Sequence, residues 1–143
     1  MRHYLERKVR HPIYLLLSVM LLLFLSGCNV KKEDGEKVRD LEFTVLGEND
    51  VPQQLKTILA EKRTQPFKMT FTDEQNLSIA VGYGSQQTGG YSIQVEELYL
   101  TDNAIVLDTE LMGPGKEEAV APETSYPTII IRTELLENPV IFK

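Results

Sequence analysis

The chain has 143 residues, the usual length of one domain, and its 42% hydrophobic and 25% charged residues are typical of a globular protein. The charge is unevenly distributed: residues 1–12 are basic, residues 13–27 are uncharged, and the part after Cys28 holds 11 basic against 20 acidic side chains. This net charge of −9 argues against a nucleic-acid-binding surface, because neutralising phosphates requires clustered Lys and Arg.

The N-terminal segment has the pattern of an export signal, a basic stretch followed by a short apolar run. Residues 13–27 are fewer than the roughly 20 that span a bilayer as a helix. The four residues at the end of the run, Leu25, Ser26, Gly27 and Cys28, resemble the lipobox of bacterial lipoproteins at every position. The resemblance implies that signal peptidase II recognises Leu25, Ser26 and Gly27 and that a lipid is attached to Cys28. The alternative is an uncleaved signal anchor, in which Cys28 is merely a small apolar residue.

We therefore expect a lipoprotein signal peptide at 1–27, the lipidated cysteine with a flexible polar tether at 28–40, and a β-rich domain at 41–143. The expected location is the extracytoplasmic face of the cell membrane. Cys28 is the single cysteine, so no internal disulfide is available and lipidation gives the thiol a use.

The rest of the chain predicts one helix among several short strands. Residues 53–62 place Leu55, Ile58 and Leu59 on one helical face, with Asp50 as a candidate cap and Pro52 in the first turn. Alternation of apolar and polar residues, or short apolar runs between turn signals, predicts strands at 41–46, 66–72, 77–83, 91–100, 104–111, 126–132 and 139–143. The expected fold is mainly β, a small β-sandwich or a partly open barrel with one short helix.

The composition of the exported part argues against an enzyme. Both histidines, His3 and His11, lie in the segment expected to be removed, and the chain has no Trp. Ser-His-Asp and Cys-His catalysis, His-based zinc sites and thiol redox chemistry are therefore not expected. The acidic residues fall mostly in turns and at alternate strand positions, which are typical of a solvated face. We expect no catalytic residues, no metal and no cofactor.

Two glycine-bearing loops are the candidate binding site. Gly89 and Gly90 allow backbone conformations closed to other residues, and Thr88 and Tyr91 flank them. The second loop opens with Gly113, Pro114 and Gly115, and it reaches the same end of the sheet if the intervening hairpin returns the chain there. Loops on a rigid β-scaffold commonly carry recognition. The alternative is that the glycines only make a turn and that Tyr91 packs inward.

The stretch 82–131 also resembles a known family. Residues 88–95 (TGGYSIQV), the hairpin, the Gly113-Pro114-Gly115 loop and residues 126–130 (YPTII) are similar, in order, to the C-terminal domain of the protease complex subunit PrcB family. The resemblance implies a lipoprotein that binds another protein of the cell envelope, as an accessory or stabilising subunit of a surface protease.

Two alternatives remain open. Residues 87–91 (QTGGY) resemble the first inhibitory loop of chagasin-type cysteine protease inhibitors, which are also small β-sandwiches. Those inhibitors carry an R-P-W-type loop, whereas this chain has no Trp. The other alternative is an envelope-structural lipoprotein without a dedicated partner.

Overall fold

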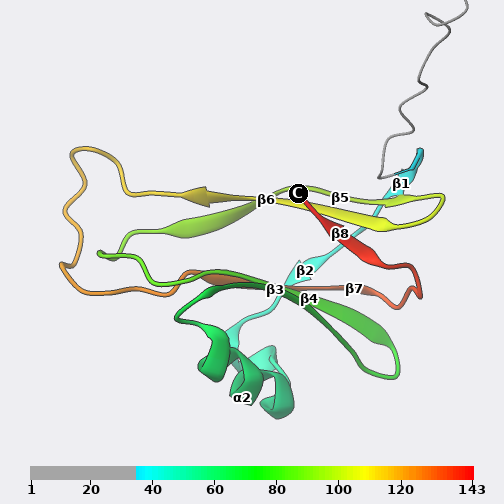
Figure 1. The fold of residues 1–143 in the computed structure, drawn as a ribbon, viewed down its shortest axis with the longest axis horizontal. Helices are drawn as coiled ribbons and strands as arrows, with labels where there is room; N and C mark the ends of the chain where they lie inside the picture. Colours follow the sequence, from blue (N-terminus) through cyan, green and yellow to red (C-terminus); the bar gives the residue numbers. More distant parts are fainter. Residues whose placement is uncertain (1–34) are drawn as a thin grey trace, which may run out of the picture. The chain divides into compact units, whose positions relative to one another are not determined.

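Two β-sheets and one α-helix make up the fold (Figure 1). The structure is a computed structural model, which describes residues 35–143. The elements in chain order are β1 (Lys37–Asp40), β2 (Thr44–Val45), the 3-10 helix η1 (Glu48–Asp50), α2 (Gln53–Lys62), β3 (Pro66–Thr72), β4 (Asn76–Tyr83), β5 (Ser92–Thr101), β6 (Ile105–Met112), β7 (Thr128–Glu134) and β8 (Val140–Phe142). The expected mainly β fold with one short helix is therefore confirmed.

Each sheet has four strands. Sheet A has the order β1-β5-β6-β8 and sheet B the order β2-β7-β4-β3. All neighbours are antiparallel except β6 and β8, which run parallel. The predicted β5–β6 hairpin forms with a regular register from Ser92↔Met112 to Leu100↔Ile105, interrupted by a bulge between Val95 and Glu97.

The hydrophobic core lies between the two sheets. Sheet B contributes alternate residues of β4 and one residue of β7, and sheet A contributes residues of β5 and β6. The buried members are Leu41, Leu77, Ile79, Val81, Leu98, Ile105, Leu107 and Ile131. Their alternation along each strand is the period-2 pattern that predicted these strands.

The segment 37–46 differs from expectation, because it passes from one sheet to the other. Residues 37–40, expected at the end of the tether, form β1 and pair with β5 of sheet A. Leu41 is buried, and its N–H donates to Leu98 O at 3.0 Å. The chain then crosses to sheet B, where β2 pairs with β7. One predicted strand at 41–46 is thus a crossing followed by a two-residue edge strand.

Two contacts join the sheets at their edges. On β1, the Arg39 guanidinium lies 2.7 Å from a carboxylate oxygen of Glu134 on β7. This ion pair raises the pKa of Arg39 and lowers the pKa of Glu134. At the other edge, Lys68 Nζ of β3 donates to Lys143 O at 3.0 Å and lies 5.6 Å from the centre of the Phe142 ring. Both pairs are exposed, so each is expected to contribute little to the stability of the fold.

The helix α2 covers the outer face of sheet B and has the predicted bounds (Figure 1). Leu55 is completely buried, whereas Leu59 is half-buried. The expected capping by Asp50 is wrong: Pro52 occupies the N-cap position, and Asp50 belongs to η1. Among residues 35–143, no helix is long and apolar enough to cross a membrane.

Candidate protein-binding site

The two glycine-bearing loops meet at one end of the sheets, as the hairpin geometry predicts (Figure 1). We call residues 84–91 and 113–127 together the loop pair. Gln86 and Ser125 form an isolated antiparallel bridge, with N–H to O distances of 2.8 and 3.0 Å. The loops therefore form a short two-stranded extension beyond sheet B, anchored to each other by backbone hydrogen bonds.

Thr88 and Gly89 bond to the second loop through their backbones. The Ser125 hydroxyl donates to Thr88 O at 2.6 Å, and Gly89 N–H donates to Ala121 O at 3.0 Å. Because these bonds use only main-chain atoms of the first loop, the Thr88 side chain is not consumed by them. Thr88 is half-buried and thus partly accessible to a partner.

Gly90 and Tyr91 make the tightest contacts within the loop pair. Gly90 has a φ of +81°, and a Cβ on it would lie 2.7 Å from Val120 Cγ1 and 3.0 Å from Pro114 Cβ. Tyr91 is half-buried with its ring beside Gly113, where a Cβ would lie 3.5 Å from Cε1 of the ring. The Tyr91 ring thus packs on the second loop and keeps an accessible surface.

The tip of the second loop is a turn closed by two hydrogen bonds between Gly115 and Glu118. Glu118 N–H donates to Gly115 O at 3.0 Å, and a Glu118 carboxylate oxygen accepts from Gly115 N–H at 3.0 Å. Glu117 and Glu123 are also exposed on this loop, against the single basic residue Lys116. The loop pair thus presents a net negative charge at its tip.

A hydrogen bond between the sheets supports the base of the loop pair. The Tyr83 hydroxyl, at the end of β4, donates to Thr109 O of β6 at 2.7 Å. At the same end of β4, Tyr83 N–H donates to Pro127 O, and the Gln86 side-chain amide donates to Tyr83 O. The two sheets therefore hold the loop pair from both sides.

The structure brings Thr88, Gly89, Gly90 and Tyr91 together with Gly113 and Pro114, as the candidate site requires. Gly115 lies instead in the hydrogen-bonded turn with Glu118 at the tip of the second loop. The lipidation site Cys28 and the recognition residues Leu25, Ser26 and Gly27 lie outside the described residues. Within residues 35–143, no group of three or more acidic, His or Cys side chains is placed to hold a metal ion.

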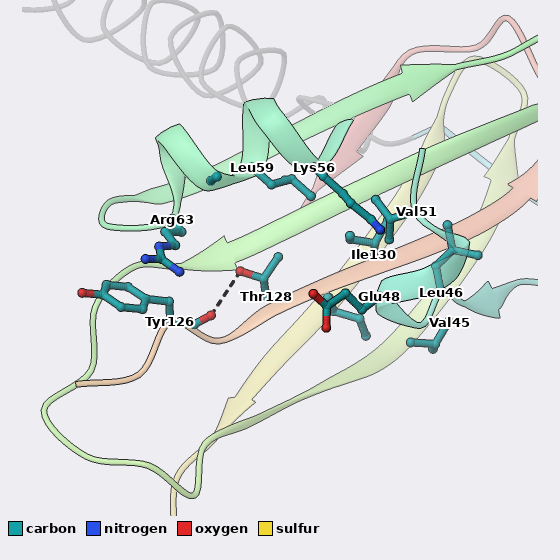
Figure 2. Close-up of a pocket in the computed structure, with 12 residues that line it drawn as sticks. Val45, Leu46, Glu48, Val51, Lys56, Leu59, Arg63, Tyr126, Thr128 and Ile130 are labelled. Atoms are coloured by element: carbon teal, nitrogen blue, oxygen red, sulfur yellow. Dashed lines mark hydrogen bonds between the residues drawn. The ribbon is translucent and has the colours of Figure 1, made fainter. Parts of the chain in front are cut away.

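A second surface feature, which the sequence did not indicate, is an open groove of about 550 Å³ between α2 and the start of β7 (Figure 2). We call it the α2–β7 groove. It is lined by Val45, Leu46, Glu48, Val51, Lys56, Leu59, Ala60, Arg63, Tyr126, Thr128, Ile129 and Ile130. These residues come from β2, η1, α2 and β7 and from the connections beside them. Leu59 and Val45 belonged to two separate predicted faces, and no local pattern could show that these faces border one groove.

A family model described as PrcB C-terminal matches residues 77–134. The match runs from β4 to β7 and includes the whole loop pair. It confirms the resemblance to a PrcB-like C-terminal domain for this segment. No curated protein and no solved structure matches the chain significantly.

Proposed function

From the PrcB-like C-terminal domain at residues 77–134, we propose that this chain is a non-enzymatic lipoprotein that binds another protein of the cell envelope. Its partner is a surface protease, for which it acts as an accessory or stabilising subunit. The family match carries this proposal, because the matched segment contains both loops of the loop pair. A mutually anchored pair of loops on a rigid β-scaffold supports a binding role, since little ordering is required when the partner binds.

Thr88 and Tyr91 are the residues through which we propose that the partner is recognised. The backbone of Thr88 is fixed by Ser125, and the Tyr91 ring is supported by Gly113. Tyr is a frequent contributor to binding energy at protein interfaces because a rigid ring offers a large contact area. Glu117, Glu118 and Glu123 are exposed on the second loop and make it acidic, so a basic partner surface would associate faster at low salt.

Crosslinking and affinity capture from native membranes test the proposal. The wild-type lipoprotein is compared with a Thr88→Ala/Tyr91→Ala double variant, and Thr57→Ala on the exposed face of α2 is the matched control. Enrichment of a protease by the wild type and the control, but not by the double variant, is the expected result. Enrichment of no protease, or equal enrichment by all three, contradicts it. Thermal unfolding of each variant shows whether the fold is retained.

The effect on the captured protease separates assistance from inhibition. We expect the protease to keep its activity longer when the lipoprotein is present, because a bound subunit stabilises the folded form by mass action. A dose-dependent loss of protease activity would instead support the chagasin-type inhibitor alternative. An envelope-structural role would leave the activity unchanged.

The membrane anchor is the second part of the proposal, and it depends on the lipobox-like residues 25–28. Cys28→Ala should abolish labelling by radioactive palmitate and release the protein from the membrane after processing. Ser26→Ala keeps a small residue before the cysteine and serves as the control. Unchanged labelling of the Cys28→Ala protein would contradict lipidation at this position.

A further inference from the structure

The α2–β7 groove runs along a strand edge that is only partly paired. β2 is the edge strand of sheet B, and it covers β7 only through Thr44↔Arg132 and Val45↔Ile131. Leu46 N–H adds a last bond to Ile130 O at 2.8 Å, after which the chain turns into η1. The N-terminal part of β7 is therefore left without a neighbouring strand on this side within the described part of the chain.

The register shows which backbone groups this edge presents. Tyr83 N–H donates to Pro127 O, so residue 127 bonds toward β4, whereas residue 130 bonds toward β2. Because bonding direction alternates along an antiparallel strand, Thr128 directs its N–H and C=O toward the β2 side. Thr128 also lines the α2–β7 groove. An exposed strand edge of this kind is a template for an added strand.

The side chains around this edge would accept an extended peptide with particular residues. The middle of the groove is apolar, with Val51, Leu59 and Ile130 facing the same space (Figure 2). At the end nearest the loop pair, the Arg63 guanidinium lies 4.8 Å from the centre of the Tyr126 ring. Arg63 makes no ion pair within residues 35–143. A guanidinium fixed on an aromatic ring still offers its donors to a carboxylate.

We propose that the α2–β7 groove binds an extended segment of a partner protein, which adds as a strand beside Thr128 and places an acidic side chain against Arg63. The main chain of the peptide bonds to the free edge, alternate apolar side chains enter the groove, and the carboxylate pairs with the guanidinium. The groove lining contains two cations, Lys56 and Arg63, and one anion, Glu48, so its net charge is positive. The charge of the groove is therefore complementary to an acidic peptide, although the domain as a whole is acidic.

Peptide binding to the full chain in detergent micelles tests this site. The probe is the heptapeptide Thr-Val-Thr-Glu-Thr-Val-Thr with both ends blocked. In an extended conformation, its two valines and its glutamate lie on one face. We expect saturable shifts of the amide resonances of Thr128 and Ile130 and slower hydrogen exchange at Thr128. A probe with glutamine in place of glutamate should bind about tenfold more weakly, the loss expected for one charge-assisted hydrogen bond.

Two comparisons keep the test independent of folding. Arg63→Gln should lower the affinity for the glutamate probe but not the affinity for the glutamine probe. Lys62→Gln makes the same charge change outside the groove and should leave both affinities unchanged. A probe N-methylated at alternate residues lacks the backbone donors, so its binding should be lost. Unchanged affinity of this methylated probe, shifts that map elsewhere, or no binding at millimolar concentration would overturn the proposal.

This site is distinct from Thr88 and Tyr91 of the loop pair. Arg63→Gln removes the cation beside Tyr126 but leaves Thr88 and Tyr91 in place, and Thr88→Ala/Tyr91→Ala changes no residue that lines the groove. Loss of protease capture with the double variant alone therefore supports the proposed function even if the peptide probe fails. Conversely, probe binding at the groove does not depend on which protease is captured.

Discussion

Ser78 and Arg132 face each other across the β4–β7 pair, and each buries a polar side-chain atom that has no hydrogen-bond partner within residues 35–143. The atoms are Ser78 Oγ and Arg132 Nε. The Arg132 Nη2 atom donates to Asp50 O at 3.2 Å, so the side chain connects sheet B to η1. Burying a polar atom without a partner is costly, so these two side chains are a locally unfavourable feature of sheet B.

Ser78→Ala should therefore be neutral or stabilising by up to about 1 kcal/mol, because it removes a buried hydroxyl that has no hydrogen-bond partner among the described residues. Thr101→Val provides the contrasting case. The Thr101 hydroxyl is equally buried, but it accepts from Ala104 N–H at 2.9 Å and donates to Ala104 O at 3.0 Å in the β5–β6 turn. Its loss should cost about 1–3 kcal/mol. Urea unfolding of both variants measures the difference, and equal destabilisation would contradict this assignment.

Gly90→Ala should destabilise the loop pair, whereas Gly89→Ala should not. Gly90 combines a positive φ with close approach to Val120 and Pro114, so a Cβ is strained and crowded. Gly89 has no positive φ, and a Cβ would meet Ala121 at an ordinary 3.7 Å. We expect a loss of about 1–2 kcal/mol for Gly90→Ala and a change within about 0.5 kcal/mol for Gly89→Ala, measured by thermal unfolding. The reverse order would show that the loop has another conformation.

This contrast illustrates how far the loop pair could be predicted from sequence. The positions of both loops and their meeting followed from the strand pattern, because a hairpin must return the chain to the end where it started. The expectation that both glycines are needed for their backbone freedom holds for Gly90 alone. Which of two adjacent glycines takes the positive φ depends on the partner loop at Val120 and Pro114, and nothing local encodes that.

The strands show the same limit. The buried stretches β4, β6 and β7 were predicted within one or two residues, because core burial imposes alternation or an apolar run. β1 was missed because an edge strand exposed on both faces has no such pattern: all four of its residues, Lys37–Asp40, are exposed. The apolar residues 41, 43 and 45 predicted one buried face, yet Phe43 is 39% and Val45 55% exposed. The chain crosses between the two sheets within this segment, so its alternation does not produce one buried face. The crossing depends on the tertiary structure and has no local sequence signal.

Gly82→Ala should be clearly destabilising, although Gly82 has an ordinary backbone conformation. Gly82 pairs with Phe67 on β3, and a Cβ would overlap the Phe67 ring. The ring is half-buried, so it would have to swing outward and expose apolar surface. We expect a loss of about 1–3 kcal/mol in chemical unfolding. The double variant Gly82→Ala/Phe67→Ala should cost less than the sum of the two single changes, since the clash is then absent. Additive losses would mean that the ring does not cover Gly82.

The fold should lose stability in acid through the β3–β4 turn. Asp73 Oδ1 accepts from Gln75 N–H at 2.9 Å and from Asn76 N–H at 2.7 Å, and these bonds lower the pKa of Asp73 below its usual value of about 3.9. Since the folded pKa is the lower one, the stabilisation is complete above the unfolded pKa and is lost as the pH falls through the folded pKa. The Arg39 guanidinium lowers the pKa of Glu134 in the same direction.

Asp73→Asn tests this dependence, because an amide oxygen still accepts the two backbone bonds but does not titrate. The thermal midpoint of the wild type should fall more steeply between about pH 5 and pH 3 than that of the variant. Glu74→Gln removes the same charge from the same turn without touching the bonds to Asp73, so it should follow the wild-type curve. Parallel curves for the wild type and Asp73→Asn would show that the acid sensitivity arises elsewhere, with the Arg39–Glu134 pair as the next group to titrate.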